Sequence, residues 1–382
     1  MKILLVTEFF PTGRDLRFSG GVEARTYYVA KYLAKNHKVF VLASLSPGTK
    51  SREKISNIDV LRVGPKRAYT ASVGHFASRL KYIKNAVEAG TSINADIVEG
   101  GNYISHFIAK RISLRKNIPA VAWYPDVWLG DWLKNAKIYG IFGEILERYN
   151  LFRGFDAYIA ISKKTRTLLS KYTRKKVHLI YCGVDQKEFF KKGEKSEKPT
   201  ILCISRLASY KNIKTLILAF AHLSRSYPNA MLQIVGEGPE EKNLKNLVYN
   251  LKIRNKVKFY SNLPRKQLIS QIKSSHVFCL PSKVEGFGIA TIEAAAAGVP
   301  YVNSNIPVHI EVTKNGTGGF LADPASPIDF SNKLSKLLSN KKLYIKKSVD
   351  ARSLSKIYNW TEITLQTEQI YINALKLRKY EK

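Results

Sequence analysis

The chain is poor in cysteine, methionine and acidic residues. Its 382 residues include 3 Cys and 2 Met, and 29 acidic residues stand against 63 Lys and Arg, which gives a formal net charge of +34. Cys182, Cys203 and Cys279 lie singly in apolar segments, without the paired spacing of a zinc site or a disulfide framework. We therefore expect free thiols and a reducing, cytoplasmic compartment.

Long apolar runs are also missing. No run reaches the roughly 18 apolar residues that a membrane-spanning helix needs, so the sequence predicts no such helix. The N-terminal segment MKILLVTEFF has one Lys and a short apolar run that soon meets Glu8. This pattern is typical of a first β-strand and not of a signal peptide.

The excess of positive charge indicates anionic partners. Nucleic acid, an anionic membrane face and phosphorylated substrates all fit a field of this sign. The basic residues are spread along the chain, and no RRM, KH or helix-turn-helix signature accompanies them. We accordingly expect no nucleic-acid partner, and a nucleic-acid-binding protein is the less favoured alternative.

Strand-like runs alternate with helical patterns along the whole chain, which is long enough for two domains. Such alternation predicts βαβ units, so we expect an α/β protein with two doubly wound parallel sheets. The predicted domains are residues 1–182, joined by a C-terminal helix at 360–382, and residues 199–359. The charged segment 183–198 is the predicted linker. The predicted strands lie at 3–7, 38–43, 58–63, 95–98, 120–123, 157–161 and 177–181, and near residues 201, 232, 257, 277 and 301.

The segment at residues 281–300, PSKVEGFGIATIEAAAAGVP, organises the second half of the chain. It follows a strand-like run, and its helix formers from Ile292 to Ala297 stop at Gly298. A strand, a glycine turn and a helix in this order place backbone N–H groups where they can bind a phosphate.

Two carboxylates, Glu285 and Glu293, flank this turn. Carboxylates accept hydrogen bonds, so the pair suits the hydroxyls of a sugar. Gly286 and Gly288 let the backbone approach a ligand on either side of Phe287. Two glutamates alone also fit an ordinary turn with a solvated Glu and a capping Glu.

The segment as a whole resembles the E-x7-E signature of the retaining, nucleotide-sugar-dependent glycosyltransferases of family 4. The resemblance implies the GT-B fold, with two Rossmann-like domains facing a cleft. It also implies transfer of a hexose from a UDP- or GDP-linked sugar with retention at the anomeric carbon. Glu285 would then act catalytically on the ring hydroxyls of the sugar, and Glu293 would bind the ribose. The residues that carry the match are Pro281, Ser282, Glu285, Gly286, Phe287, Gly288, Glu293, Ala294, Ala297, Gly298 and Pro300.

Two further loops of the second half fit a donor site. Arg206 and Lys211 share one strand-to-helix loop, where a forked guanidinium and an ammonium can meet a diphosphate. They resemble the family's basic element at this place, although a chain so basic has many such pairs. Gly236 and Gly238 resemble the family's G-x-G-P turn. They either admit the nucleotide or only form a tight turn.

In the first half, Gly20 and Gly21 stand directly before a helical pattern and resemble the family's N-terminal glycine loop, which approaches the donor phosphates. A plain turn is the alternative. Asp126 follows the strand at 120–123, where many family members carry a His-Asp pair. This sequence has Pro125 in place of the His. Asp126 would orient acceptor or sugar hydroxyls, or it is simply a turn residue.

No Asp-x-Asp pair occurs, which removes the usual metal ligands of the other large glycosyltransferase fold. We expect no metal and no cofactor beyond the donor as co-substrate. The charge of the leaving nucleoside diphosphate would be offset by Arg206, Lys211 and the helix N-terminus from Phe287 to Ile289.

Two basic amphipathic segments in the first half bear on the acceptor. Either they are ordinary helices that cover the sheet, or they rest on an anionic membrane face, peripheral to the cytoplasm. In the second case we expect a lipid-linked or membrane-presented glycan as the acceptor. The alternative is a non-transferase GT-B protein, such as a nucleotide-sugar epimerase or a degenerate binder. The two apolar stripes are Val73, Phe76, Leu80, Ile83, Val87 and Ile138, Ile141, Phe142, Ile145, Tyr149.

Overall fold

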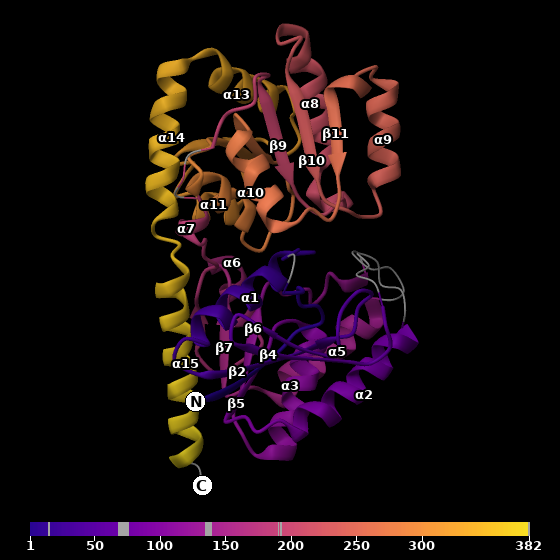
Figure 1. Cartoon of the computed structure of the whole chain (residues 1–382), viewed down its shortest axis with the longest axis vertical. Helices are drawn as coiled ribbons and strands as arrows, with labels where there is room; N and C mark the ends of the chain where they lie inside the picture. Colours follow the sequence, from indigo (N-terminus) through magenta and orange to yellow (C-terminus); the bar gives the residue numbers. More distant parts are fainter. Residues whose placement is uncertain (14–15, 68–75, 134–139, 190, 192, 381–382) are drawn as a thin grey trace. The chain divides into compact units, whose positions relative to one another are not determined.

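The computed structural model describes residues 1–13, 16–67, 76–133, 140–189, 191 and 193–380. The chain divides into two compact units. The first unit comprises Met1–Cys182 and Trp360–Lys382, and the second comprises Gly183–Asn359. Figure 1 shows that each contains a sheet with helices packed around it.

The first unit has an eight-stranded sheet in the order β3-β4-β2-β1-β5-β6-β7-β8. Its strand pairs are parallel except at the edge, where β3 runs antiparallel to β4. The strands are β1 Lys2–Val6, β2 Lys38–Ser44, β3 Arg52–Ile55, β4 Ile58–Val63, β5 Ile97–Gly100, β6 Ala120–Tyr124, β7 Ala157–Ala160 and β8 Val177–Leu179.

The helices of the first unit begin and end at expected signals. The Asn102 side chain accepts a hydrogen bond from Ser105 N and caps α3, which ends at left-handed Asn117. The last helix, α15, packs on α1, where the Trp360 ring stacks on Tyr28 at 5.4 Å. The helices are α1 Gly21–Leu33, α2 Phe76–Ser92, α3 Tyr103–Lys116, α5 Gly140–Arg153, α6 Lys163–Leu169 and α15 Trp360–Tyr380.

The second unit has a six-stranded parallel sheet in the order β11-β10-β9-β12-β13-β14. Its strands are β9 Thr200–Ile204, β10 Met231–Val235, β11 Val257–Tyr260, β12 Val277–Leu280, β13 Tyr301–Ser304 and β14 Gly319–Ala322. Its helices are α7 Gln186–Phe189, α8 Ile213–Ser226, α9 Glu241–Asn250, α10 Arg265–Ser274, α11 Ile289–Ala296, α12 Pro307–Val312, α13 Pro327–Ser339 and α14 Lys341–Ser355.

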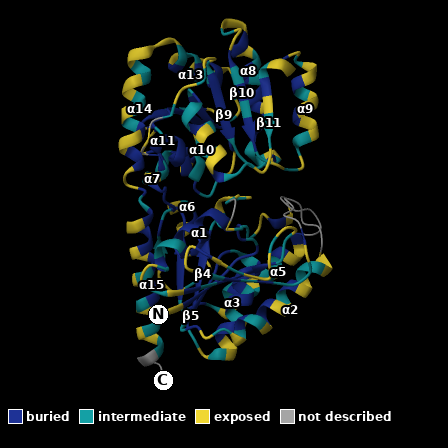
Figure 2. Ribbon diagram, viewed as in Figure 1, coloured by how far each residue is buried: buried dark blue, intermediate teal, exposed yellow. Residues whose placement is uncertain are grey.

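Burial follows the layers of each unit, with strands buried and outer helix faces exposed (Figure 2). All four residues of β5 and of β12 are buried, as a parallel sheet covered on both faces requires. In the second unit α8 packs against α13, and α11 packs against α14. The expected α/β fold with two doubly wound sheets is therefore present.

The strand order of each sheet changes direction once. In the first unit β1 lies between β2 and β5, so that Val6 pairs with both Leu42 and Gly100. In the second unit β9 lies between β10 and β12. Open α/β sheets bind ligands at the carboxyl ends of the strands beside such a switch point. The loops that follow β1, β9 and β12 are the ones in which the sequence places donor residues.

Three local expectations need correction. The charged strand β3 and the glycine-flanked strand β14 were not predicted. The predicted linker 183–198 is part of the second unit, where Val184 and Phe189 are each 1% exposed and so belong to the core. Within the described part of the chain, no helix is long and apolar enough to cross a membrane.

Candidate functional site

Two loops at the switch point of the second unit are bonded to each other. The loop after β9 meets the loop after β12 where Tyr210 O accepts a hydrogen bond from Lys283 N at 2.8 Å. The Asn212 side chain donates to Pro281 O at 3.1 Å and to Pro324 O at 2.8 Å. These bonds fix the position of Lys211, which lies between Tyr210 and Asn212.

Lys211 and Glu285 meet across these loops. Their Nζ and Oε2 atoms are 2.7 Å apart, and the side chains are 14% and 13% exposed. Ser282 Oγ donates to the same Oε2 at 3.1 Å. Burial alone would raise the pKa of Glu285, but the charge of Lys211 and the hydrogen bonds from Lys211 and Ser282 outweigh it and lower the pKa overall. The carboxylate is therefore held ionised, as an acceptor for hydroxyl groups.

The glycines after β10 let two backbones approach closely. A Cβ on Gly236 would lie 1.9 Å from Ser205 O, and one on Gly238 would lie 2.2 Å from Leu207 O. Leu207 N donates to Glu237 O at 2.9 Å, so the two loops are bonded on either side of Arg206. Packing alone thus requires both glycines, and they position the segment that carries Arg206.

The turn before α11 has the geometry that the sequence predicts. Gly288 has a φ of 85° and precedes α11, and as a glycine it has no side chain with which to cap this helix start. A Cβ built on Gly288 would lie 3.7 Å from Glu285 Cγ, so Glu285 lies beside the helix start. Phe287 is 2% exposed and packs edge-on against Tyr358, so it offers only its backbone to a ligand.

Glu293 lies in the second turn of α11 and belongs to a different ion-pair network. Arg265 Nη2 is 2.7 Å from Glu293 Oε1 and also 2.7 Å from Glu188 Oε2. Burial raises the pKa of Glu293, and the Arg265 guanidinium offsets this only in part. The structure thus brings Lys211, Glu285 and Gly288 together, while Glu293 is tied to Arg265.

Three buried polar atoms near this turn were not predicted. The atoms are His309 Nε2, Asn303 Oδ1 and Ser304 Oγ, and none has a hydrogen-bond partner among the described residues. His309 Nδ1 bonds Ser304 O at 2.9 Å, so Nδ1 carries the hydrogen and Nε2 is an acceptor. Burial lowers the pKa of His309, which keeps the ring neutral near pH 7.

Asn303 is linked to the turn beside Glu285 by a hydrogen bond to α11. Asn303 Nδ2 donates to Thr291 Oγ1 at 2.9 Å, and Thr291 lies beside Gly288. Glu285, His309 Nε2 and Asn303 Oδ1 accept hydrogen bonds and the Ser304 hydroxyl can accept or donate one, so these groups suit a ligand with many hydroxyls. In the sequence, only the position of His309 in the short helix α12 after β13 could have suggested this.

In the first unit, Gly20 and Gly21 form the start of α1. Gly20 is the residue before the helix and accepts a hydrogen bond from Ala24 N at 3.1 Å. Glu23 accepts from Ser19 N at 2.6 Å and holds the loop against the helix. Burial raises the pKa of Glu23 to about 7.

Asp126 lies just after β6, where its Oδ1 accepts a hydrogen bond from Val127 N at 2.9 Å. Lys164 Nζ is 3.9 Å from the same oxygen. His106 does not replace the histidine that Pro125 displaces. It is 1% exposed, its Nε2 bonds Trp123 O at 2.9 Å, and burial lowers its pKa to about 4.

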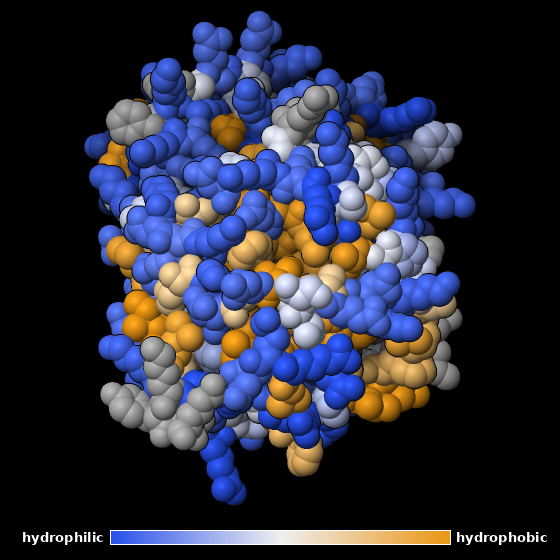
Figure 3. All heavy atoms as spheres, turned by 60° about the horizontal axis from the view of Figure 1, so that its bottom comes forward, coloured by the Kyte–Doolittle hydropathy of each residue, from blue (hydrophilic) through white to orange (hydrophobic). Residues whose placement is uncertain are grey.

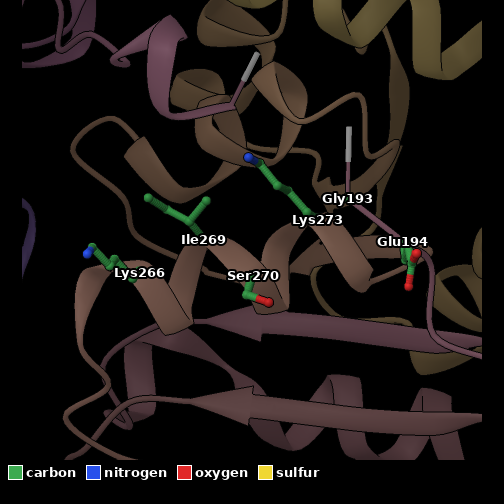
Figure 4. A pocket seen from close by; sticks show the side chains of 6 residues that line it. All are labelled: Gly193, Glu194, Lys266, Ile269, Ser270 and Lys273. Carbon is green, nitrogen blue, oxygen red and sulfur yellow. The ribbon is translucent and has the colours of Figure 1, made fainter. Parts of the chain in front are cut away.

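One cavity, of about 450 Å³, opens on the second unit (Figure 4). It lies between α10 and the segment at residues 193–194, where Gly193 packs closely on Lys273. None of the predicted donor residues lines it, so we assign it no part in the donor site. Its lining residues are Gly193, Glu194, Lys266, Ile269, Ser270 and Lys273.

Comparison with known proteins agrees with this geometry. The family model "Glycosyltransferase Family 4" matches residues 19–188, and "Glycosyl transferases group 1" matches residues 184–353. An uncharacterised glycosyltransferase of Methanocaldococcus jannaschii is 25% identical, over 99% of each chain.

Solved structures of similar fold include sucrose-phosphate synthase from Thermosynechococcus elongatus. Its TM-score is 0.84 at 18% identity, over 98% of this chain and 99% of that one. Anabaena HepE in complex with UDP-glucose has a TM-score of 0.72 at 18% identity, over 97% and 98% of the two chains. Since the two family models adjoin and together run from residue 19 to residue 353, the chain belongs to the family 4 glycosyltransferases and has the GT-B fold.

Proposed function

We propose that the chain is a retaining transferase that moves a hexose from a UDP- or GDP-linked sugar to a hydroxyl of a lipid-linked or membrane-presented glycan. The observation that carries this proposal is the contact of Lys211 with Glu285 at 2.7 Å. This contact places a cation that can bind phosphate next to an ionised carboxylate that can accept hydrogen bonds from sugar hydroxyls. Both lie at the switch point of the second unit. Anabaena HepE, a protein of similar fold, has been solved in complex with UDP-glucose, which supports a donor of this kind.

The roles of the residues follow from their chemistry. Arg206, Lys211 and the start of α11 would offset the charge of the diphosphate as the sugar leaves, which requires no metal. Glu285 would accept hydrogen bonds from the ring hydroxyls of the sugar. Glu293, held by Arg265 through one oxygen, would bind the ribose with the other. Gly20, Gly21 and Asp126 are our candidates for contacts from the first unit.

Substitution of Glu285 by Gln tests the proposal. The amide keeps the size of the side chain but loses the charge that faces Lys211 and the sugar, so we expect transfer to fall at least about 100-fold. Binding of the nucleoside diphosphate should persist, because its phosphates meet Arg206 and Lys211. Turnover of nucleotide sugar and binding of the diphosphate are both measured, with the exposed Glu241→Gln as the control. Full transfer activity in Glu285→Gln would contradict the assigned role.

We also propose that the first unit rests on an anionic membrane face. Phe76 and Leu80 on α2, and Phe142 and Ile145 on α5, are between 44% and 60% exposed. The rings of Phe76 and Phe142 are 4.6 Å apart, which joins the two helices into one apolar surface. Lys81 and Lys84 are exposed on α2. Figure 3 shows that hydrophobic side chains gather in patches among hydrophilic ones on the face drawn. Of the predicted stripes, Val73 and Ile138 lie outside the described residues.

A further inference from the structure

A second cluster of charged side chains lies at the ligand edge of the first unit. Glu8 follows β1, Ser44 ends β2, and Arg67 lies four residues after β4. These three strands are neighbours in the sheet, so their carboxyl ends lie side by side. Arg79 reaches the cluster from α2. No role proposed above uses any of these residues, although ligands of open α/β sheets bind at this edge.

The cluster carries more positive than negative charge. Arg67 Nη1 is 2.7 Å and Arg79 Nε is 3.3 Å from the same atom, Glu8 Oε1. No second carboxylate of the described residues lies within ion-pair distance of either arginine. Arg67 is buried, with its side chain 4% exposed, so one of the two positive charges is uncompensated in a largely dry place.

The hydrogen bonds of the cluster are incomplete as well. Arg67 Nε donates to Ser44 Oγ at 3.2 Å. Arg67 Nη2 is buried and has no hydrogen-bond acceptor among the described residues, and Arg79 Nε, although 3.3 Å from Glu8 Oε1, makes no hydrogen bond to it. Buried polar groups are normally paired, and a group that is not paired needs an explanation.

Another buried arginine of the same unit shows what a purely structural pair looks like. Both terminal nitrogens of Arg25 donate to the two oxygens of Glu99. Tyr371 OH donates to that carboxylate at 2.6 Å. One guanidinium is thus matched by one carboxylate there, whereas Arg67 and Arg79 share a single oxygen of Glu8.

We propose that Arg67 and Arg79 bind an anionic group of the acceptor, a phosphate ester or a carboxylate. The inference rests on the proposed transferase function and names the class of substrate that the first unit takes. Guanidinium groups match the oxygens of phosphate and carboxylate in geometry and charge. Glu8 holds the two arginines in place, and the incoming anion balances their remaining charge and satisfies their free N–H groups.

Binding of inorganic phosphate to the full chain tests the inference. The protein is first saturated with the nucleoside diphosphate that binds it, so that the donor loops are occupied, and phosphate is then titrated by calorimetry. We expect saturable binding to the wild type, weakened at least about tenfold in Arg79→Gln. Arg79 is 14% exposed whereas Arg67 is 4% exposed, so this variant should fold even if Arg67→Gln does not. The control is Arg115→Gln, an exposed arginine in the last turn of α3.

Further measurements distinguish a phosphate ester from a carboxylate. They also distinguish failure of this inference from failure of the transferase proposal. Tighter binding of glucose 6-phosphate than of glucuronate assigns a phosphate ester, and the reverse assigns a carboxylate. Equal phosphate affinity in Arg79→Gln and the wild type, or equal weakening in Arg115→Gln, would overturn the inference while leaving the transferase proposal intact. If no nucleoside diphosphate binds at all, it is the transferase proposal that fails.

Discussion

At the scale of single residues, the residues that we propose for the donor site could be chosen from the sequence, but their contacts could not. Glu285, Lys211 and the turn at Gly288 could be predicted because each follows a strand at a recognisable motif. The contribution of Asn212, which bonds Pro281 O and Pro324 O, depends on parts of the chain that are 69 and 112 residues away. The free Nε2 of His309 depends in the same way on packing that no local pattern encodes.

Glu147 gives a residue-scale prediction about pH. Burial raises the pKa of Glu147 to about 7, although hydrogen bonds from Trp132 and Trp128 act to lower it. The folded state therefore binds the proton of this carboxyl group more tightly than the unfolded state does. The resulting stability is fully present at pH values below the pKa of the unfolded state, and it is lost as the pH rises towards 7. We expect Glu147→Gln to be more stable than the wild type at pH 8, by about 1–3 kcal/mol. At pH 5 the two should be nearly equal.

Thermal unfolding of both proteins at pH 5 and pH 8 measures this difference. Glu144→Gln is the matched control, because Glu144 lies on the same helix and pairs with the exposed Arg148. The account of Glu147 is wrong if its variant and the wild type change in parallel with pH.

At the scale of elements, buried strands were predictable and exposed or glycine-flanked ones were not. β12, with the sequence Val-Phe-Cys-Leu, is a continuous apolar run, which strongly favours a covered parallel strand. β3, with the sequence Arg-Glu-Lys-Ile, is an edge strand whose pairing with β4 comes from the hairpin and not from its own hydrophobicity. β14 begins at Gly319, directly after left-handed Gly318, so a turn was the natural interpretation.

The helices α2 and α5 carry the prediction about membranes. Their exposed apolar side chains and the neighbouring lysines should bind vesicles that contain phosphatidylglycerol more tightly than vesicles of phosphatidylcholine alone. Phe142→Ser combined with Ile145→Ser should reduce this binding at least about tenfold, because each exposed side chain would bury apolar area in the lipid. Vesicle co-sedimentation measures both effects.

The control replaces Ile345 and Val349 on α14, which are 54% and 60% exposed, by serine. Both double variants remove the same kind of exposed apolar area, but only one touches the proposed surface. Equal binding to the two kinds of vesicle, or equal loss in the two variants, would rule out this surface.

At the scale of the whole molecule, the alternation of strands and helices was sufficient to predict two doubly wound units. The boundary was harder to predict, because charge along 183–198 is typical of a linker while Val184 and Phe189 anchor this segment in a core. The net charge of +34 limits the class of partner but does not locate a site. Sites follow from where strands end, and the loops after β9 and β12 are such places in the second unit.

The central claim is that these loops bind a nucleoside diphosphate through Arg206 and Lys211. Thermal unfolding of the wild type with UDP, GDP, ADP or CMP tests it most directly, alongside Arg206→Ala and the exposed control Arg254→Ala. A ligand at about 100 times its dissociation constant stabilises a fold by about 2.7 kcal/mol. We predict that one diphosphate stabilises the wild type and Arg254→Ala, and that Arg206→Ala loses this effect. No stabilisation by any of the four, or undiminished stabilisation of Arg206→Ala, would contradict the account.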